Sequence, residues 1–206
     1  MNRHSFIRPL VAVCIALFAT SSIVTATSIR PPSFEQLVDQ SGRIVRATIE
    51  NIRPYADSYE GKTIVRTEVT LNVLESISGN VPTGELKIRM LGGEVAGLRL
   101  DVGAMPKFER GQEVVLFLHP RDGFICPTVG WGHGKYQVDR SATDGIPRVR
   151  RSNGESLRGL DQISQPIHAG PLETQSFDPL SQSDGMTLGQ FRQLVRQQFE
   201  FNRRQE

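Results

Sequence analysis

One stretch of the chain alternates apolar and polar residues so regularly that it dictates a long β-strand. The run begins near Thr63, and its even-numbered residues are mostly polar. The residues that share the other face are Val65, Thr67, Val69, Leu71 and Val73. Because successive side chains of a strand point to opposite faces of a sheet, the run predicts a strand with one buried face. A strand of this kind needs neighbours, so the chain must be built around a β-sheet.

Four further strands are expected around it. Val45, Ala47 and Ile49 alternate with polar residues in a strand that begins at Arg43, and the turn residues of 54–61 would close a hairpin. The segments 86–90, 114–118 and 124–138 follow in order. Residues 114–118 are almost continuously apolar, which predicts burial on both faces, and the glycines of 130–134 predict bulges in the last strand.

Two helices are predicted at the ends of this series. Ser33 and Gln36 have the spacing of a capping box, which places a short helix over about 33–40. Thr187 and Gln190 repeat the spacing before an apolar stripe that predicts an amphipathic helix over about 188–201. We expect this stripe to pack on its own domain, with a partner's groove as the alternative, because an isolated helix of this length is marginal.

These elements predict a mainly β fold, a small five-stranded OB-like barrel with a short N-terminal helix and a C-terminal helix. A β-sandwich is the alternative. The barrel domain with its N-terminal helix would cover residues 27–140, and residues 186–206 would form the C-terminal helix. The intervening residues 141–185 are rich in Ser, Gly, Gln, Pro and Asp and predict a polar linker, partly disordered.

The first 26 residues have the form of a cleavable signal peptide. Arg3 and Arg8 precede an apolar run that extends over residues 9–19. This run is shorter than the roughly 17 to 25 residues that a membrane span needs. Val24-Thr25-Ala26 places small side chains where a signal peptidase cuts, with Ser28 as the alternative site. The sequence therefore predicts a secreted or periplasmic protein with no stable membrane anchor after cleavage.

Removal of this segment changes the composition of the working chain. It takes away Cys14, which leaves Cys126 as the only cysteine and allows no internal disulfide. It also takes Arg3 and Arg8 from the 24 basic residues, which leaves 22 against 22 acidic residues. A neutral chain offers no bulk charge for nucleic acid or an anionic membrane, so neither is an expected partner.

The order of the segments resembles a group of uncharacterised secreted bacterial proteins. The matching pieces lie in 37–49, 67–73, 91–93, 103–118 and 132–136, none of which is a catalytic motif. More distantly, the plan is similar to the netrin-like, OB-type fold of tissue metalloproteinase inhibitors. Those inhibitors chelate the protease zinc with an N-terminal cysteine, whereas this mature chain would begin near Thr27 without one, so inhibition would need another route.

The glycine-rich segment around Trp131 is the candidate binding patch. It lacks the spacing of a phosphate loop and precedes no predicted helix, so a bulged strand is the simpler interpretation. If Trp131 were exposed beside His133 and Tyr136, these three residues could bind a partner. The long connection from Leu91 to Arg110 could serve as a binding loop or could merely plug one end of the barrel.

A metal site is the alternative for the same region. His119, Cys126 and His133 are spaced seven residues apart on or near the last two strands, and imidazole and thiolate are ligands for zinc or copper. His168 could be a fourth ligand if the linker folds back. The simpler interpretation is a strand end, a small buried thiol and a bend, because the short paired spacings of structural zinc sites are missing.

The function that these observations favour is a non-enzymatic exported binding module, with an extracytoplasmic protein as its expected partner and no cofactor. No G-x-S-x-G or H-E-x-x-H motif and no close carboxylate pair occurs. A metal-dependent or hydrolytic enzyme that uses His119, Cys126 and His133 is the first alternative, and a protease inhibitor is the second.

The signal peptide generates a direct prediction. When the full chain is expressed in a host that exports it, mass spectrometry of the extracytoplasmic fraction should find a protein that begins at Thr27, or at Ile29 for the alternative cut. Recovery of the uncut chain in the membrane fraction would contradict the prediction.

Overall fold

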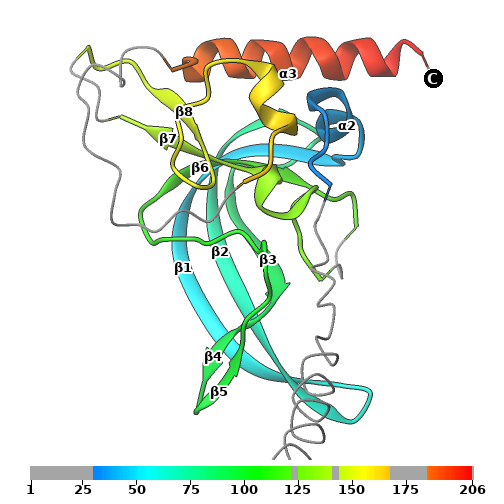
Figure 1. The fold of residues 1–206 in the computed structure, drawn as a ribbon, viewed down its shortest axis with the longest axis vertical. Coiled ribbons are helices and arrows are strands. Elements are labelled where there is room, and N and C mark those ends of the chain that lie inside the picture. Colours follow the sequence, from blue (N-terminus) through cyan, green and yellow to red (C-terminus); the bar gives the residue numbers. More distant parts are fainter. Residues whose placement is uncertain (1–29, 122–124, 141–143, 168–184, 206) are drawn as a thin grey trace, which may run out of the picture.

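A computed structural model describes residues 30–121, 125–140, 144–167 and 185–205 of the chain. Its described part is mainly β, as predicted, with one six-stranded antiparallel sheet, one two-stranded sheet and two α-helices (Figure 1). No helix in these ranges combines the length and the apolar character that crossing a membrane requires. The predicted signal peptide lies outside the described residues.

The elements follow one another along the chain in the order given below. The strands are β1 (Arg43–Tyr59), β2 (Lys62–Ser78), β3 (Gly84–Leu91), β4 (Gly93–Val95), β5 (Leu98–Leu100), β6 (Glu113–Leu118), β7 (Lys135–Asp139) and β8 (Arg148–Arg151). The α-helices are α2 (Phe34–Asp39) and α3 (Leu188–Arg203), and the 3-10 helices are η1 (Trp131–Gly134) and η2 (Leu160–Ser164). The large sheet has the strand order β3-β2-β1-β6-β7-β8.

The hairpin of β1 and β2 is longer than the sequence predicts. Both strands have 17 residues and form a curved ribbon that extends beyond the rest of the sheet (Figure 1). Pro54, expected in the turn, lies in β1 and pairs with Thr67. Pro54 is tolerated because β6 pairs with β1 only as far as Thr48, so the opposite edge of β1 has no strand partner there. The turn itself contains only Glu60 and Gly61, both with positive φ, as a tight hairpin requires.

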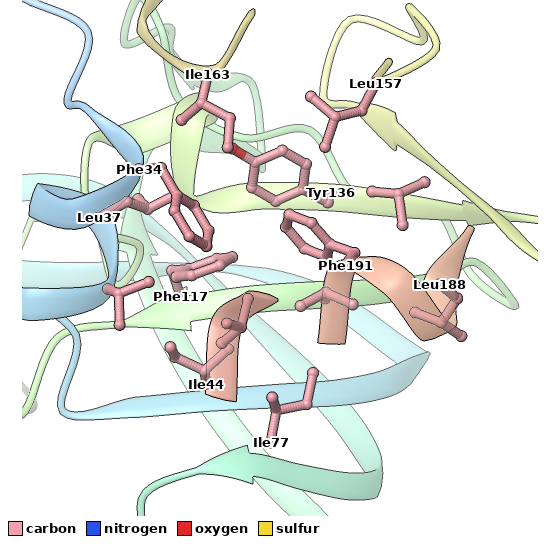
Figure 2. Packing of buried hydrophobic residues seen from close by; sticks show 14 of the residues in the cluster. Phe34, Leu37, Ile44, Ile77, Phe117, Tyr136, Leu157, Ile163, Leu188 and Phe191 are labelled. Atoms are coloured by element: carbon pink, nitrogen blue, oxygen red, sulfur yellow. The ribbon is translucent and has the colours of Figure 1, made fainter. Parts of the chain in front are cut away.

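Strand β6 is buried on both faces, as predicted, because it separates two apolar clusters. We call the cluster under the helices the helix-side core; its larger members are Phe34, Leu37, Ile44, Phe117, Tyr136, Leu157, Ile163 and Phe191 (Figure 2). The other cluster, the sheet-side core, is formed by residues of β1, β2, β3 and β6; it contains Val45, Ala47, Ile49, Val69, Leu71, Val73, Ile88, Val114, Leu116 and Leu118. Neighbouring residues of β6 therefore point into different cores.

The C-terminal helix packs on its own chain, as expected. Leu188, Phe191 and Val195 of α3 are buried in the helix-side core. Thr187 caps the helix: its hydroxyl accepts a hydrogen bond of 3.2 Å from the Gln190 amide, while Gln190 Oε1 accepts the Thr187 amide at 2.9 Å. Ser33 and Gln36 form the same reciprocal pair at α2, so both predicted capping boxes are confirmed.

Three features of the sheet differ from the sequence expectations. No closed barrel is found among the described strands, so the predicted barrel is not confirmed, and the main sheet has six strands instead of five. The predicted fifth strand is shorter, because the glycine-rich residues before Lys135 form a turn and η1. Residues 144–167, expected as part of a polar linker, contribute β8 and η2 and bury Val149, Leu157 and Ile163, whose apolar side chains are too widely spaced to show a period.

The helix-side core gives a prediction that compares two phenylalanines of one helix. Phe191→Ala should lower the free energy of unfolding by about 3 to 5 kcal/mol, since the ring is fully buried and its loss leaves a cavity. Phe201→Ala, at a position that is 55% exposed, should change it by no more than about 0.5 kcal/mol. Urea unfolding measures both values, and similar losses for the two variants would contradict the docking of α3.

Candidate functional site

Buried polar side chains gather around the turn that connects β6 to β7. Of the buried polar or charged residues in the described ranges, four lie here: Thr128, His133, Lys135 and Arg151. Burying a charged or polar group costs free energy unless it finds partners, so such groups concentrate where they hold a specific geometry. This region also contains the three residues predicted to bind a partner.

The turn holds Trp131 in an unusual backbone conformation. Trp131 has φ of +59° and follows Gly130 at +62°, so two consecutive residues are left-handed. Such a conformation is strained for a bulky residue and persists only where the surroundings impose it. Here the Thr128 hydroxyl donates to the Trp131 carbonyl at 2.7 Å, and the Trp131 amide donates to the Thr128 carbonyl at 3.2 Å. These two hydrogen bonds fix the peptide groups before and after Trp131.

A second strained residue lies beside the first. Ala104, in the long loop before β6, has φ of +62°, and its carbonyl accepts the Gly132 amide at 3.0 Å. In the described residues the other non-glycine residues with positive φ are Glu60 and Ala96, both in the tight turns of hairpins. Ala104 and Trp131 lie in turns of longer loops, closed by the Met105 amide on the Val102 carbonyl at 3.4 Å and the His133 amide on the Gly130 carbonyl at 3.1 Å, and these two turns meet at one place. Strain that is concentrated in this way is typical of functional sites.

Four chain segments converge on the tryptophan turn. A Cβ on Gly130 would come within 2.8 Å of Pro32, and a Cβ on Gly132 would come within 3.3 Å of the Ala104 carbonyl and 3.4 Å of the Ser152 hydroxyl. The same Cβ would contact Ile167 at 3.9 Å. Glycine is therefore required at Gly130, where φ is also positive, while a larger residue at Gly132 would need its neighbours to shift slightly. Trp131 as a whole residue is half-buried at this junction.

The other two predicted binding residues, His133 and Tyr136, are buried in the interior next to the turn. Tyr136 belongs to the helix-side core, where its ring centroid lies 5.6 Å from that of Phe117 and 4.9 Å from that of Phe191 (Figure 2). Burial lowers the pKa of His133 and the nearby Arg151 lowers it further, while a hydrogen bond with the Ile163 backbone opposes the shift. His133 is therefore a neutral, packed imidazole, and Trp131 alone of the three reaches the surface.

Lys135 ties the long loop to the turn from inside the molecule. Its ammonium donates to the Lys107 carbonyl and lies 5.3 Å from the centroid of the Phe108 ring. Burial lowers the pKa of Lys135 to about 8, although the carboxylate of Glu109 works in the opposite direction. The contacts place residues 107–108 over one end of the sheet-side core, against which Phe108 packs. Lys135 could not be recognised from the sequence, because nothing in the short segment of β7 indicates that its lysine is buried.

Arg151 is a second buried cation that holds a chain segment near the turn, and the sequence did not indicate it either. Its side chain is buried; it donates to the carbonyls of Gln165 and Pro166 and forms an ion pair with Glu155 at 3.0 Å. These contacts fix the segment after η2 against β8. Arginine is suited to this role because its planar fork reaches several acceptors at once.

Of the residues of the predicted metal site, His119 lies beside the segment that contains Cys126, whereas His133 is buried near Arg151 and Ile163. The His119 amide donates to the Pro127 carbonyl at 3.0 Å, and burial lowers the pKa of its imidazole. Cys126 is buried with its Sγ 3.2 Å from the Thr128 hydroxyl, and burial raises the pKa of the thiol. Over the part of the chain that the structure describes, no three His, Cys, Asp or Glu residues gather into a group that could hold a metal ion. His168 lies outside the described residues.

The arrangement is therefore a rigid frame that presents one aromatic side chain. Thr128, Lys135 and Arg151 hold the turn, the long loop and the segment after η2 in place. The reactive groups nearby, the Cys126 thiol and the Lys135 amine, are both buried. Such a frame is suited to binding through Trp131.

The buried lysine predicts an unusual dependence of stability on pH. An unfolded lysine keeps its proton to a pH near 10.5, whereas folded Lys135 releases it near 8, so the unfolded state binds more protons between these values. Wild-type stability should gain up to about 3 kcal/mol from this residue as the pH rises through that window. Lys135→Met should lack the gain, and Lys87→Met, at an exposed lysine paired with Glu85, should keep it. Urea unfolding at several pH values tests this, and parallel curves for wild type and Lys135→Met would contradict it.

Comparison with known proteins supplies no family for this arrangement. Neither a scan against models of protein families nor a search of curated proteins finds a match for this chain. The resemblance to secreted bacterial proteins and to the netrin-like fold therefore stays a prediction from the sequence.

Proposed function

We propose that this chain is an exported, non-enzymatic binding module whose partner is an extracytoplasmic protein. The observation that carries the proposal is the partly exposed Trp131, held in a strained conformation by the hydrogen bonds of Thr128. Tryptophan is among the residues that contribute most to binding free energy at protein interfaces. The strained backbone would then serve to orient the indole toward the partner.

A preformed turn lowers the entropic cost of association. A flexible loop must be ordered when a partner binds, and this cost reduces affinity. The Trp131 turn is already fixed by its own hydrogen bonds, by the Ala104 carbonyl and by the close approach of Pro32. The surrounding segments add small and apolar groups, among them Ala104 and Ile167, that a protein partner could cover.

The proposal includes a more specific fold than an open β-sheet. Strands β1 and β2 curve around the sheet-side core, and β3 and β6 contribute to it from either side. We interpret this arrangement as a partly open barrel of the OB type, in which loops at the barrel ends commonly bind ligands. Export to the periplasm or the cell exterior depends on the predicted signal peptide.

The two alternative functions have less support. A zinc or copper enzyme that uses His119, Cys126 and His133 would need these side chains to converge, and no such group of ligands is found among the described residues. A protease inhibitor depends on the distant netrin-like resemblance alone. No contact in the described residues favours either function.

The test compares two aromatic residues that differ in their surroundings. Wild type, Trp131→Ala and Tyr59→Ala are immobilised and exposed to the extracytoplasmic fraction of the native cells. Tyr59, at the tip of the β1–β2 hairpin, is 58% exposed and is the control for nonspecific aromatic contact. We expect a protein that wild type and Tyr59→Ala retain and that Trp131→Ala loses.

Fluorescence of the purified pair then provides a direct readout. Trp131 is the only tryptophan in the chain, so its emission reports on this turn alone if the partner's signal is subtracted. Binding should shift the emission to shorter wavelength as the indole leaves water. Retention of the same proteins by Trp131→Ala, or an unchanged emission spectrum in the complex, would reject the proposal.

A further inference from the structure

A second charged cluster lies where α3 crosses the sheet, apart from the Trp131 turn. Glu75 of β2 accepts hydrogen bonds from three arginines. Arg46 Nε lies 3.2 Å from Glu75 Oε2, Arg196 lies 2.7 Å from Oε1, and Arg192 contacts the same Oε1. One carboxylate thus faces three guanidinium groups, two of them from the C-terminal helix.

The cluster continues across the sheet to a second carboxylate. Arg46 also donates to Glu113 at 2.8 Å, and Arg140 donates to Glu113 at 2.8 Å and 3.1 Å. Burial works to raise the pKa of Glu113, but the hydrogen bonds from Arg140 and Arg46 outweigh it and hold the pKa below its ordinary value. The Glu113 carboxylate is therefore charged at neutral pH. We call these six residues the arginine ladder: Arg46, Glu75, Glu113, Arg140, Arg192 and Arg196.

The ladder contains more positive than negative charge. Its four guanidinium groups face two carboxylates, which leaves two positive charges uncompensated within the cluster. Arg192 and Arg196 are also one helical turn apart, a spacing at which like charges repel. An anion that approaches such a cluster stabilises it, because each positively charged guanidinium group attracts the same anion and these attractions add.

The ladder also has unused hydrogen-bond donors and access to solvent. In the described residues the Nε of Arg192 is buried and has no hydrogen-bond partner. The side chains of Arg140 and Arg196 are 54% and 50% exposed, so a solute can reach both of them. Glu75 accepts one hydrogen bond from each of its three arginines, and each guanidinium carries five donor hydrogens, so most of these donors are not bound by Glu75.

We propose that the arginine ladder binds a small oxyanion, a phosphate or sulfate group, beside Arg192 and Arg196. Arginine pairs with such groups through two parallel hydrogen bonds, and a tetrahedral anion has enough oxygens for several guanidinium groups. The bound anion supplies the missing negative charge and strengthens the contact of α3 with the sheet. This function is independent of binding at Trp131.

Thermal unfolding of the mature protein tests the proposal with inorganic phosphate as the probe. Phosphate should raise the unfolding midpoint above that in chloride at the same ionic strength and pH. Arg196→Ala should weaken phosphate binding about tenfold, measured by calorimetric titration, because it removes one charged donor. Arg99→Ala is the matched control: Arg99 is an exposed arginine that lies near Glu94 and Asp101, and its loss should leave phosphate binding unchanged.

A second variant separates anion binding from damage to the fold. Glu75→Gln keeps the shape of the side chain and removes the competing charge, so phosphate should stabilise this variant more than it stabilises wild type. Circular dichroism verifies that each variant keeps its helices. Comparison with glycerol 3-phosphate distinguishes a site for the free anion from one that also accepts a phosphate ester. Equal stabilisation by chloride, unchanged phosphate affinity in Arg196→Ala, or no added effect in Glu75→Gln would overturn the proposal and leave the ladder as an internal clamp for α3.

Discussion

The burial of β6 between two apolar layers is the interaction on which the remaining structure depends. Val115 and Phe117 point into the helix-side core, while Val114, Leu116 and Leu118 point into the sheet-side core. The first layer is completed by α2, α3 and the segments around β8 and η2, and the second by the curvature of β1 and β2 (Figure 1). Neither layer could form without the other, because an exposed face of β6 would leave large apolar side chains in water.

The candidate site is attached directly to this doubly buried strand. The Val129 amide donates to the Phe117 carbonyl at 2.9 Å, and the His119 amide donates to the Pro127 carbonyl at 3.0 Å. The polypeptide therefore reverses at the end of β6 and runs back along it before it reaches Trp131. A turn held in this way can keep Trp131 and Ala104 in left-handed conformations that a free loop would relax. Stability of the core and rigidity of the site are thus linked.

Local patterns predicted the parts of the fold that depend on local physics. The alternation around Val69, the apolar run of β6 and the two capping boxes each correspond to an element in the structure. Long-range closeness could not be predicted in this way. Nothing near Lys135 in the sequence shows that residues 107–108 cover it, and the partners of Arg151 lie in a segment whose composition resembles a linker. For the same reason, His133 and Tyr136 could be assigned to a region but not to the core side of the turn.

Hydrogen exchange measured by mass spectrometry tests the central claim, that the Trp131 turn is a rigid extension of the β6 core. The account predicts that the peptide covering Cys126–Gly134 exchanges as slowly as β6, because its amides open only when the core unfolds. The tip of the β1–β2 hairpin around Tyr59 should exchange much faster, since β6 does not reach it. Exchange of the Trp131 peptide at the rate of the hairpin tip, while β6 stays protected, would contradict the account.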